Sequence, residues 1–296
     1  MIHRFLPPRQ GITLIEVLAA IFIMGVGMLA LFTLFPLGAL SMARAVRDDR
    51  ASAIAANAAS LATAMDLRND PNVAFLLSQG GSPTGRGAPV LVDPSFVSLA
   101  LNGTNPPGSP GTFRWSFSLL GGAINRVAPQ YAANSTDAAR WFTFQEEMTF
   151  EKTGQVTTDP TRLRPGTYTW TYLLRRPRAN DPALVEMSVI IYAGRAADVA
   201  DPEPTFTGCV TTGPNSIDLP YPAGAKPNIR RGTWVMDTTV SGGTVNAFAY
   251  RVENVVDKDS TTLSLEVDPA LKANVTSLVV LEKVIAVVDR STTWKP

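Results

Sequence analysis

One carboxylate, Glu16, lies near the start of a long apolar run and is the residue whose type and position most need a chemical explanation. Between Ile12 and Leu40 it is the only charged side chain. An acid inside a membrane-spanning helix costs roughly 2.5–3.5 kcal/mol at the helix centre and less near its end, so a cation should offset it. Cleavage after Gly11 would create an ammonium group at Ile12, where it could pair with Glu16 within one copy or between two.

The apolar run itself has the length of a membrane-spanning helix, which needs about 20 residues at ~1.5 Å each. A secretory signal peptide has an apolar region of only about 7–15 residues, and a plain anchor leaves Glu16 unexplained. A buried core helix would not need so complete an absence of charge. Arg4 and Arg9 precede the run, whereas the arginines after it are partly offset by acids. The N-terminus is therefore predicted to be cytoplasmic.

Residues 11–18, Gly-Ile-Thr-Leu-Ile-Glu-Val-Leu, resemble the prepilin cleavage and methylation signature of type IV pilins and type II secretion pseudopilins. The following run resembles minor members more than major ones. The resemblance implies that prepilin peptidase cuts between Gly11 and Ile12 and N-methylates Ile12. It also implies that Glu16 pairs with a neighbouring subunit's amine. The family usually has Phe where this chain has Ile12.

The resemblance further implies a structural, non-enzymatic subunit, a minor pilin or pseudopilin of a type IV pilus or type II secretion pseudopilus. It would cross the bacterial inner membrane once, with its head in the periplasm, and then enter the filament. Expected partners are prepilin peptidase, other pilins or pseudopilins, the inner-membrane assembly platform and, before assembly, membrane lipid. The alternatives are a membrane-tethered periplasmic binding module that uses the prepilin export route without polymerising, and a secreted hydrolase behind an ordinary signal peptide.

Periodicity predicts an α+β fold, with a long N-terminal helix packed on an antiparallel sheet and a β-rich C-terminal region. Ile54, Ala58, Leu61 and Met65 recur at helical steps and should face that sheet. Pro36 predicts a kink or local unwinding of the helix. The expected divisions are a leader (1–11), a transmembrane and filament-core helix (12–40), its amphipathic continuation (41–68), a β-rich pilin-like head (69–200), a Pro-rich linker (201–228) and a C-terminal β-rich module (229–296). The last segment is expected to be either a second small β module or further strands added to the first sheet.

Composition excludes several kinds of chemistry. The only histidine, His3, lies in the segment expected to be removed, so no histidine-based triad or metal site can form in the mature chain. A net charge of +1 argues against a nucleic-acid surface, and no cofactor motif is present. Asp257, Asp259 and Asp268 could supply oxygen ligands to calcium, as in related major pseudopilins. Their spacing is not that of an EF-hand loop, and an acidic hairpin tip is the commoner explanation.

The single cysteine, Cys209, excludes an intramolecular disulfide. Many type IVa pilins link their C-terminal region by a disulfide, and this chain departs from that pattern. Stability must therefore come from burial, and we expect Cys209 to be a small filler side chain rather than a nucleophile.

Overall fold

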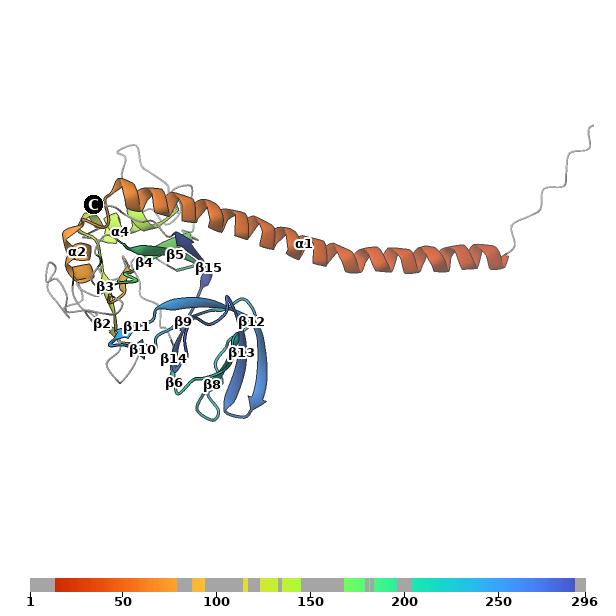
Figure 1. Ribbon diagram of the computed structural model, residues 1–296. Coiled ribbons are helices and arrows are strands. Elements are labelled where there is room, and N and C mark those ends of the chain that lie inside the picture. Colours follow the sequence, from red (N-terminus) through yellow and green to blue (C-terminus); the bar gives the residue numbers. More distant parts are fainter. Residues whose placement is uncertain are drawn as a thin grey trace, which may run out of the picture. The chain divides into compact units, whose positions relative to one another are not determined.

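The computed structural model describes residues 14–78, 87–93, 114–116, 123–132, 135–144, 168–178, 181, 184–195 and 204–290. The chain divides into two units, residues 1–50 and 51–296. The first helix, α1 (Leu14–Ala64), begins in the first unit and ends in the second (Figure 1). It is continuous helix through Pro36, so the predicted local unwinding is not present, and a kink at Pro36 remains a prediction.

The end of α1 lies in the second unit, where one face packs on a sheet. The residues of that face are at most 4% exposed and nearly all are small: Ala51, Ile54, Ala55, Ala58 and Ala62. Tyr172, on a strand of the sheet, donates a hydrogen bond of 2.8 Å to the carbonyl of Ala58. The predicted packing of Ile54 and Ala58 is confirmed, and Leu61 also packs against this core although it is partly exposed; Met65 is partly exposed as well. Because alanine side chains are small, the helix lies close to the sheet. The buried contact is therefore made mainly by alanines and not by larger apolar side chains.

The sheet beneath α1 has six strands in the order β15-β5-β4-β1-β3-β2. Their bounds are β1 (Val90–Val92), β2 (Arg114–Ser116), β3 (Ala123–Val127), β4 (Tyr168–Arg175), β5 (Glu186–Ala193) and β15 (Val284–Arg290). Neighbours are antiparallel except β1 and β3, which run parallel. This arrangement confirms the predicted α+β class, with one parallel pair added to the expected antiparallel sheet.

Short helices complete the region around this sheet: α2 (Pro71–Ser78), a 3₁₀ turn η2 (Gln130–Ala132) and α4 (Ser135–Phe142). Asp70 caps α2, because one carboxylate oxygen accepts the amides of Asn72 and Val73. Its other oxygen accepts the amide of Gln130 at 2.6 Å. A single carboxylate therefore ties the start of α2 to η2.

A second sheet has seven strands in the order β6-β14-β9-β12-β13-β8-β7 and curls so that β6 lies against β8. Its strands are β6 (Thr205–Thr207), β7 (Val210–Gly213), β8 (Ser216–Pro220), β9 (Trp234–Asp237), β12 (Phe248–Asp259), β13 (Thr262–Asp268) and β14 (Ser277–Leu281). Between β9 and β12 along the chain, β10 (Val240–Ser241) and β11 (Thr244–Val245) form a separate two-stranded sheet. The curled sheet encloses its own apolar core, which includes Ile217, Tyr250 and Leu265.

This topology corrects one expected division and bears on the two alternatives for another. The segment 201–228 is not simply a linker, because β6, β7 and β8 lie in it. Three of its prolines lie where strands tolerate them: Pro204 precedes β6, Pro214 lies in the turn between β7 and β8, and Pro220 ends β8. For the segment 229–296 the structure shows a part of each alternative: β9, β12, β13 and β14 belong to the second sheet, whereas β15 returns to pair with β5 in the first.

The two sheets pack against each other through a third apolar cluster. Leu91, Leu173 and Ile190 of the first sheet meet Met236 and Val279 of the second. Because side chains alternate across a strand, the first sheet buries one face on α1 and the other on the second sheet. Along the chain, the strands of the seven-stranded sheet come between β5 and β15, which pair with each other in the six-stranded sheet.

One arginine reinforces this contact between sheets. Arg175 of β4 donates to the carbonyl of Ala247 at 3.0 Å, and its guanidinium lies 5.1 Å from the ring centre of Phe248. It also donates to Ser188 at 3.1 Å within its own sheet. Both sheets therefore share a polar as well as an apolar connection.

Candidate functional site

The N-terminal part of α1 carries the residue predicted to direct assembly. Glu16 lies in the first turn of α1, where the positive end of the helix dipole favours a carboxylate. Its side chain is exposed, and Leu14 and Ile15 beside it are 80% and 76% exposed. Gly11 and Ile12, the predicted cleavage and methylation positions, lie outside the described residues. The structure thus places the acid at the helix start and leaves both processing positions as predictions.

The apolar segment that follows is long and apolar enough to cross a membrane. None of its most apolar stretch is buried inside the chain. Large apolar side chains such as Ile21, Phe22 and Leu29 are more than 60% exposed. Exposed surface of this kind must be covered by lipid or by other helices. The acid therefore lies at the start of a surface that the chain does not cover itself.

The three candidate calcium ligands do not converge. Asp257 forms an ion pair with Lys226 at 2.6 Å. Asp259 accepts hydrogen bonds from the amide and hydroxyl of Thr261, and these bonds lower its pKa. Asp268 lies at the other end of β13, six residues beyond Thr262 and therefore about 20 Å away. Across the described part of the chain, no group of three or more histidine, cysteine, aspartate or glutamate side chains could hold a metal ion.

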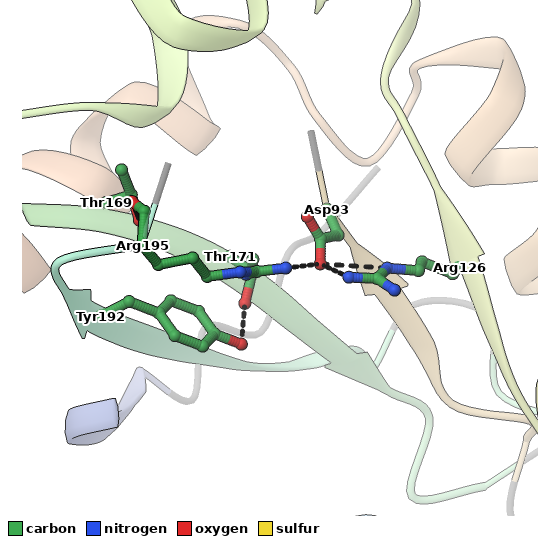
Figure 2. Close-up of polar contacts among 6 residues, drawn as sticks. All are labelled: Asp93, Arg126, Thr169, Thr171, Tyr192 and Arg195. Atoms are coloured by element: carbon green, nitrogen blue, oxygen red, sulfur yellow. Dashed lines mark hydrogen bonds and ion pairs between the residues drawn. The ribbon is translucent and has the colours of Figure 1, made fainter. Parts of the chain in front are cut away.

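A buried ionic cluster in the head escaped the sequence analysis. Asp93, directly after β1, is fully buried and accepts hydrogen bonds from Arg126 of β3 and from Arg195 after β5 (Figure 2). The Arg126 Nε contact is 3.0 Å and the Arg195 contact is 2.8 Å. Arg195 also lies 4.3 Å from the ring centre of Tyr192. The three charged residues come from three chain segments and join the ends of their strands.

The electrostatics of this cluster favour an ionised Asp93. Burial would by itself raise the pKa of the Asp93 carboxyl, but Arg126 and Arg195 outweigh it and hold the pKa well below its usual range. One signal could have revealed this cluster, although the sequence analysis did not use it. Arg126 stands two residues from Ile124 and so shares a strand face with a buried apolar side chain. A charge on such a face needs a buried partner.

Cys209 is packed in the apolar core of the second sheet and is 3% exposed. Burial raises the pKa of its thiol to about 12, so the thiolate that acts as a nucleophile is scarce at neutral pH. These surroundings agree with a filler side chain.

Comparison with known proteins identifies the N-terminal region. Residues 6–32 match the family model described as the prokaryotic N-terminal methylation motif. The chain thus carries the type IV pilin and pseudopilin signature of a protein processed as a prepilin. None of the curated proteins matches the chain. Among solved structures, a phage phi92 endosialidase matches 42% of this chain and 18% of its own length, with 8% identity. Its TM-score of 0.19 is too low to indicate a shared fold.

Proposed function

We propose that this chain is a non-enzymatic structural subunit, a minor pilin or pseudopilin of a type IV pilus or a type II secretion pseudopilus. One observation carries the proposal. The matched methylation motif at residues 6–32 includes Glu16, and the structure has that acid in the first turn of an exposed apolar helix. A methylated ammonium at the neighbouring helix start is a fitting partner for it.

Processing would proceed in the inner membrane. Prepilin peptidase would cut after Gly11, remove residues 1–11 and methylate the new amino group of Ile12. The N-terminus would start on the cytoplasmic side and the head would lie in the periplasm. Cleavage leaves the apolar segment attached, so the same helix serves first as a membrane anchor and then as a filament element.

Assembly would replace lipid around the helix with the helices of other pilins or pseudopilins at the inner-membrane platform. The exposed apolar side chains of α1 support this proposal because they need a cover in either state. An acid left unpaired among packed helices is strongly unfavourable, whereas one paired with an ammonium is tolerated. Glu16 would therefore fix how far each subunit enters the bundle.

The first test is the mass of the mature N-terminus. Purified protein should begin at Ile12 and carry one additional methyl group. A chain that still begins at Met1, or one that begins after the apolar segment, would contradict prepilin processing. In the second case an ordinary signal peptide and a secreted protein would be the better explanation.

The second test addresses Glu16. Glu16→Ala should leave membrane insertion intact and remove most of the protein from sheared filament fractions, while Glu16→Asp keeps the charge and should retain part of the incorporation. Equal incorporation of Glu16→Ala and the parent protein would count against the pairing. A parent protein that is correctly processed yet absent from every sheared fraction would instead favour the membrane-tethered binding module.

A further inference from the structure

A charged band on α1 directly follows the apolar run. Five of the seven residues from 44 to 50 carry charge: Arg44, Arg47, Asp48, Asp49 and Arg50. All five side chains are exposed. At ~1.5 Å per residue the band is about 9 Å long, a little less than two helical turns. It is the first place after the membrane-spanning residues where the helix can make ionic contacts.

The two signs of charge point in different directions around the helix. At about 100° per residue, the three arginines fall within an arc of about 120° centred on Arg47. The midpoint of Asp48 and Asp49 lies about 150° from that centre. The band therefore has a basic face and a largely separate acidic face, which we call the arginine face and the aspartate face.

The chain does not neutralise these faces itself. Within the described residues, Arg47 and Asp48 form one ion pair, at 3.8 Å, and their side chains are 43% and 69% exposed. No ion pair within that part of the chain involves Arg44, Asp49 or Arg50. An exposed pair of this length contributes little to stability. Most of the band's charge remains available to a partner.

We propose that the charged band binds a second copy of this chain, with the arginine face of one helix against the aspartate face of the next. This inference rests on the proposed function and names a partner for it. A contact that repeats along a filament is heterologous, so each subunit must present two different, complementary surfaces. One helix with opposed basic and acidic faces meets that requirement.

Charge balance favours this partner over a phospholipid surface. The band has three positive and two negative charges, so its net charge is only +1. Recognition of an anionic membrane surface uses clusters of about 4–8 basic residues, more than the three arginines of this band. The two aspartates are needed in the contact between copies and would oppose binding to lipid.

The contact would fix the rotational orientation of two neighbouring helices, which apolar packing alone leaves unspecified. Between packed helices the charges are partly removed from water, which strengthens both attraction and repulsion. Turning one helix by about 150° about its own axis would bring its arginine face against the arginine face of the other. Repulsion in the wrong orientation therefore adds to attraction in the right one.

Two complementary variants of the full chain test the proposal. The acidic variant carries Arg44→Glu, Arg47→Glu and Arg50→Glu, and the basic variant carries Asp48→Lys and Asp49→Lys. These substitutions keep good helix formers in place. Each variant alone should lose about tenfold in the sheared filament fraction, equivalent to ~1.4 kcal/mol per contact. Co-expression of the two should restore incorporation, because each supplies the face that the other lacks.

Matched controls separate this inference from the proposed function. Arg47→Lys keeps the charge and should assemble as the parent does. Both charge variants must be cleaved after Gly11, methylated, and exported with the head in the periplasm, which mass spectrometry and protease accessibility report. If the parent and Glu16 variants behave as expected but the charge variants assemble normally, the charged band is not an interface. If each variant fails alone and the mixture does not recover, the partner is not a second copy.

Discussion

Glu16 and Asp93 are two carboxylates in opposite surroundings, one in each unit of the chain. Asp93 is fully buried and has two arginine partners from its own chain. Glu16 is exposed among apolar side chains and has no ion pair within the described residues. Burial with partners makes Asp93 part of the folded head. Exposure on an uncovered apolar helix makes Glu16 a group whose partner we propose lies on another subunit.

The largest expected effect comes from neutralising Asp93. Asp93→Asn leaves two buried guanidinium groups without their carboxylate, which should lower the free energy of unfolding by about 3–5 kcal/mol. For a head of this size Tm should fall on the order of 10 °C. The matched change Glu16→Gln should leave Tm of the detergent-solubilised protein unchanged. Equal Tm values for the two variants would remove the distinction between the two acids.

The same acid should give the head a specific pH dependence. The folded pKa of Asp93 lies below its ordinary value of 3.8, so its stabilising contribution is complete above that value and is lost as pH falls through the folded pKa. The difference in Tm between the parent and Asp93→Asn should be constant from about pH 5 to pH 8 and shrink below about pH 4. A difference that grows in acid would mean that the carboxyl is protonated in the folded head.

A second contrast compares the buried face and the exposed face of α1 near its C-terminal end. Ala58→Leu inserts a larger side chain between α1 and the first sheet, where Ala58 is fully buried, and should cost about 1–3 kcal/mol. Ala56→Leu makes the same change at an exposed position two residues away and should stay within about 0.5 kcal/mol of the parent. Denaturant unfolding of both variants measures the difference. Equal costs would show that the alanine face does not pack on the sheet.

The hydrogen bond from Tyr172 to the carbonyl of Ala58 should have a smaller effect. Its hydroxyl also accepts the indole N–H of Trp170 at 3.0 Å, so it links the helix, the sheet and a neighbouring ring. Tyr172→Phe should cost about 1 kcal/mol, because the apolar ring stays in place while the hydroxyl is removed. A loss as large as that of Asp93→Asn would mean that the ring moves as well.

The sequence predicted the methylation motif and the apolar helix because their signals are contiguous. The glycine, the acid five residues later and the apolar run lie within one short stretch of sequence, so no knowledge of chain folding is needed. The cluster of Asp93, Arg126 and Arg195 is different. Its members are 33 and 69 residues apart and meet only because β1 pairs with β3 while β5 lies two strands away in the same sheet. Sequence periodicity does not specify which strands pair.

The expected linker shows a second limit of the sequence. Prolines between residues 201 and 228 indicated a break, but Pro204, Pro214 and Pro220 lie before, between and at the end of short strands, where a missing amide is tolerated. Likewise, the return of β15 to the first sheet depends on a pairing with β5 across almost a hundred residues. A composition-based boundary cannot detect a strand that leaves one sheet and joins another.

The smallest expected effect is at the hairpin between β12 and β13. Asp257 and Lys226 form an ion pair whose side chains are both more than half exposed, so Asp257→Asn should leave Tm unchanged at physiological salt. Addition of millimolar calcium should also leave Tm unchanged, because Asp257 and Asp259 lie at one end of the hairpin and Asp268 at the other. A calcium-dependent rise in Tm that Asp257→Asn abolishes would show that the acids do converge on a cation. The hairpin would then be a third setting for a carboxylate, beside the buried Asp93 and the uncovered Glu16.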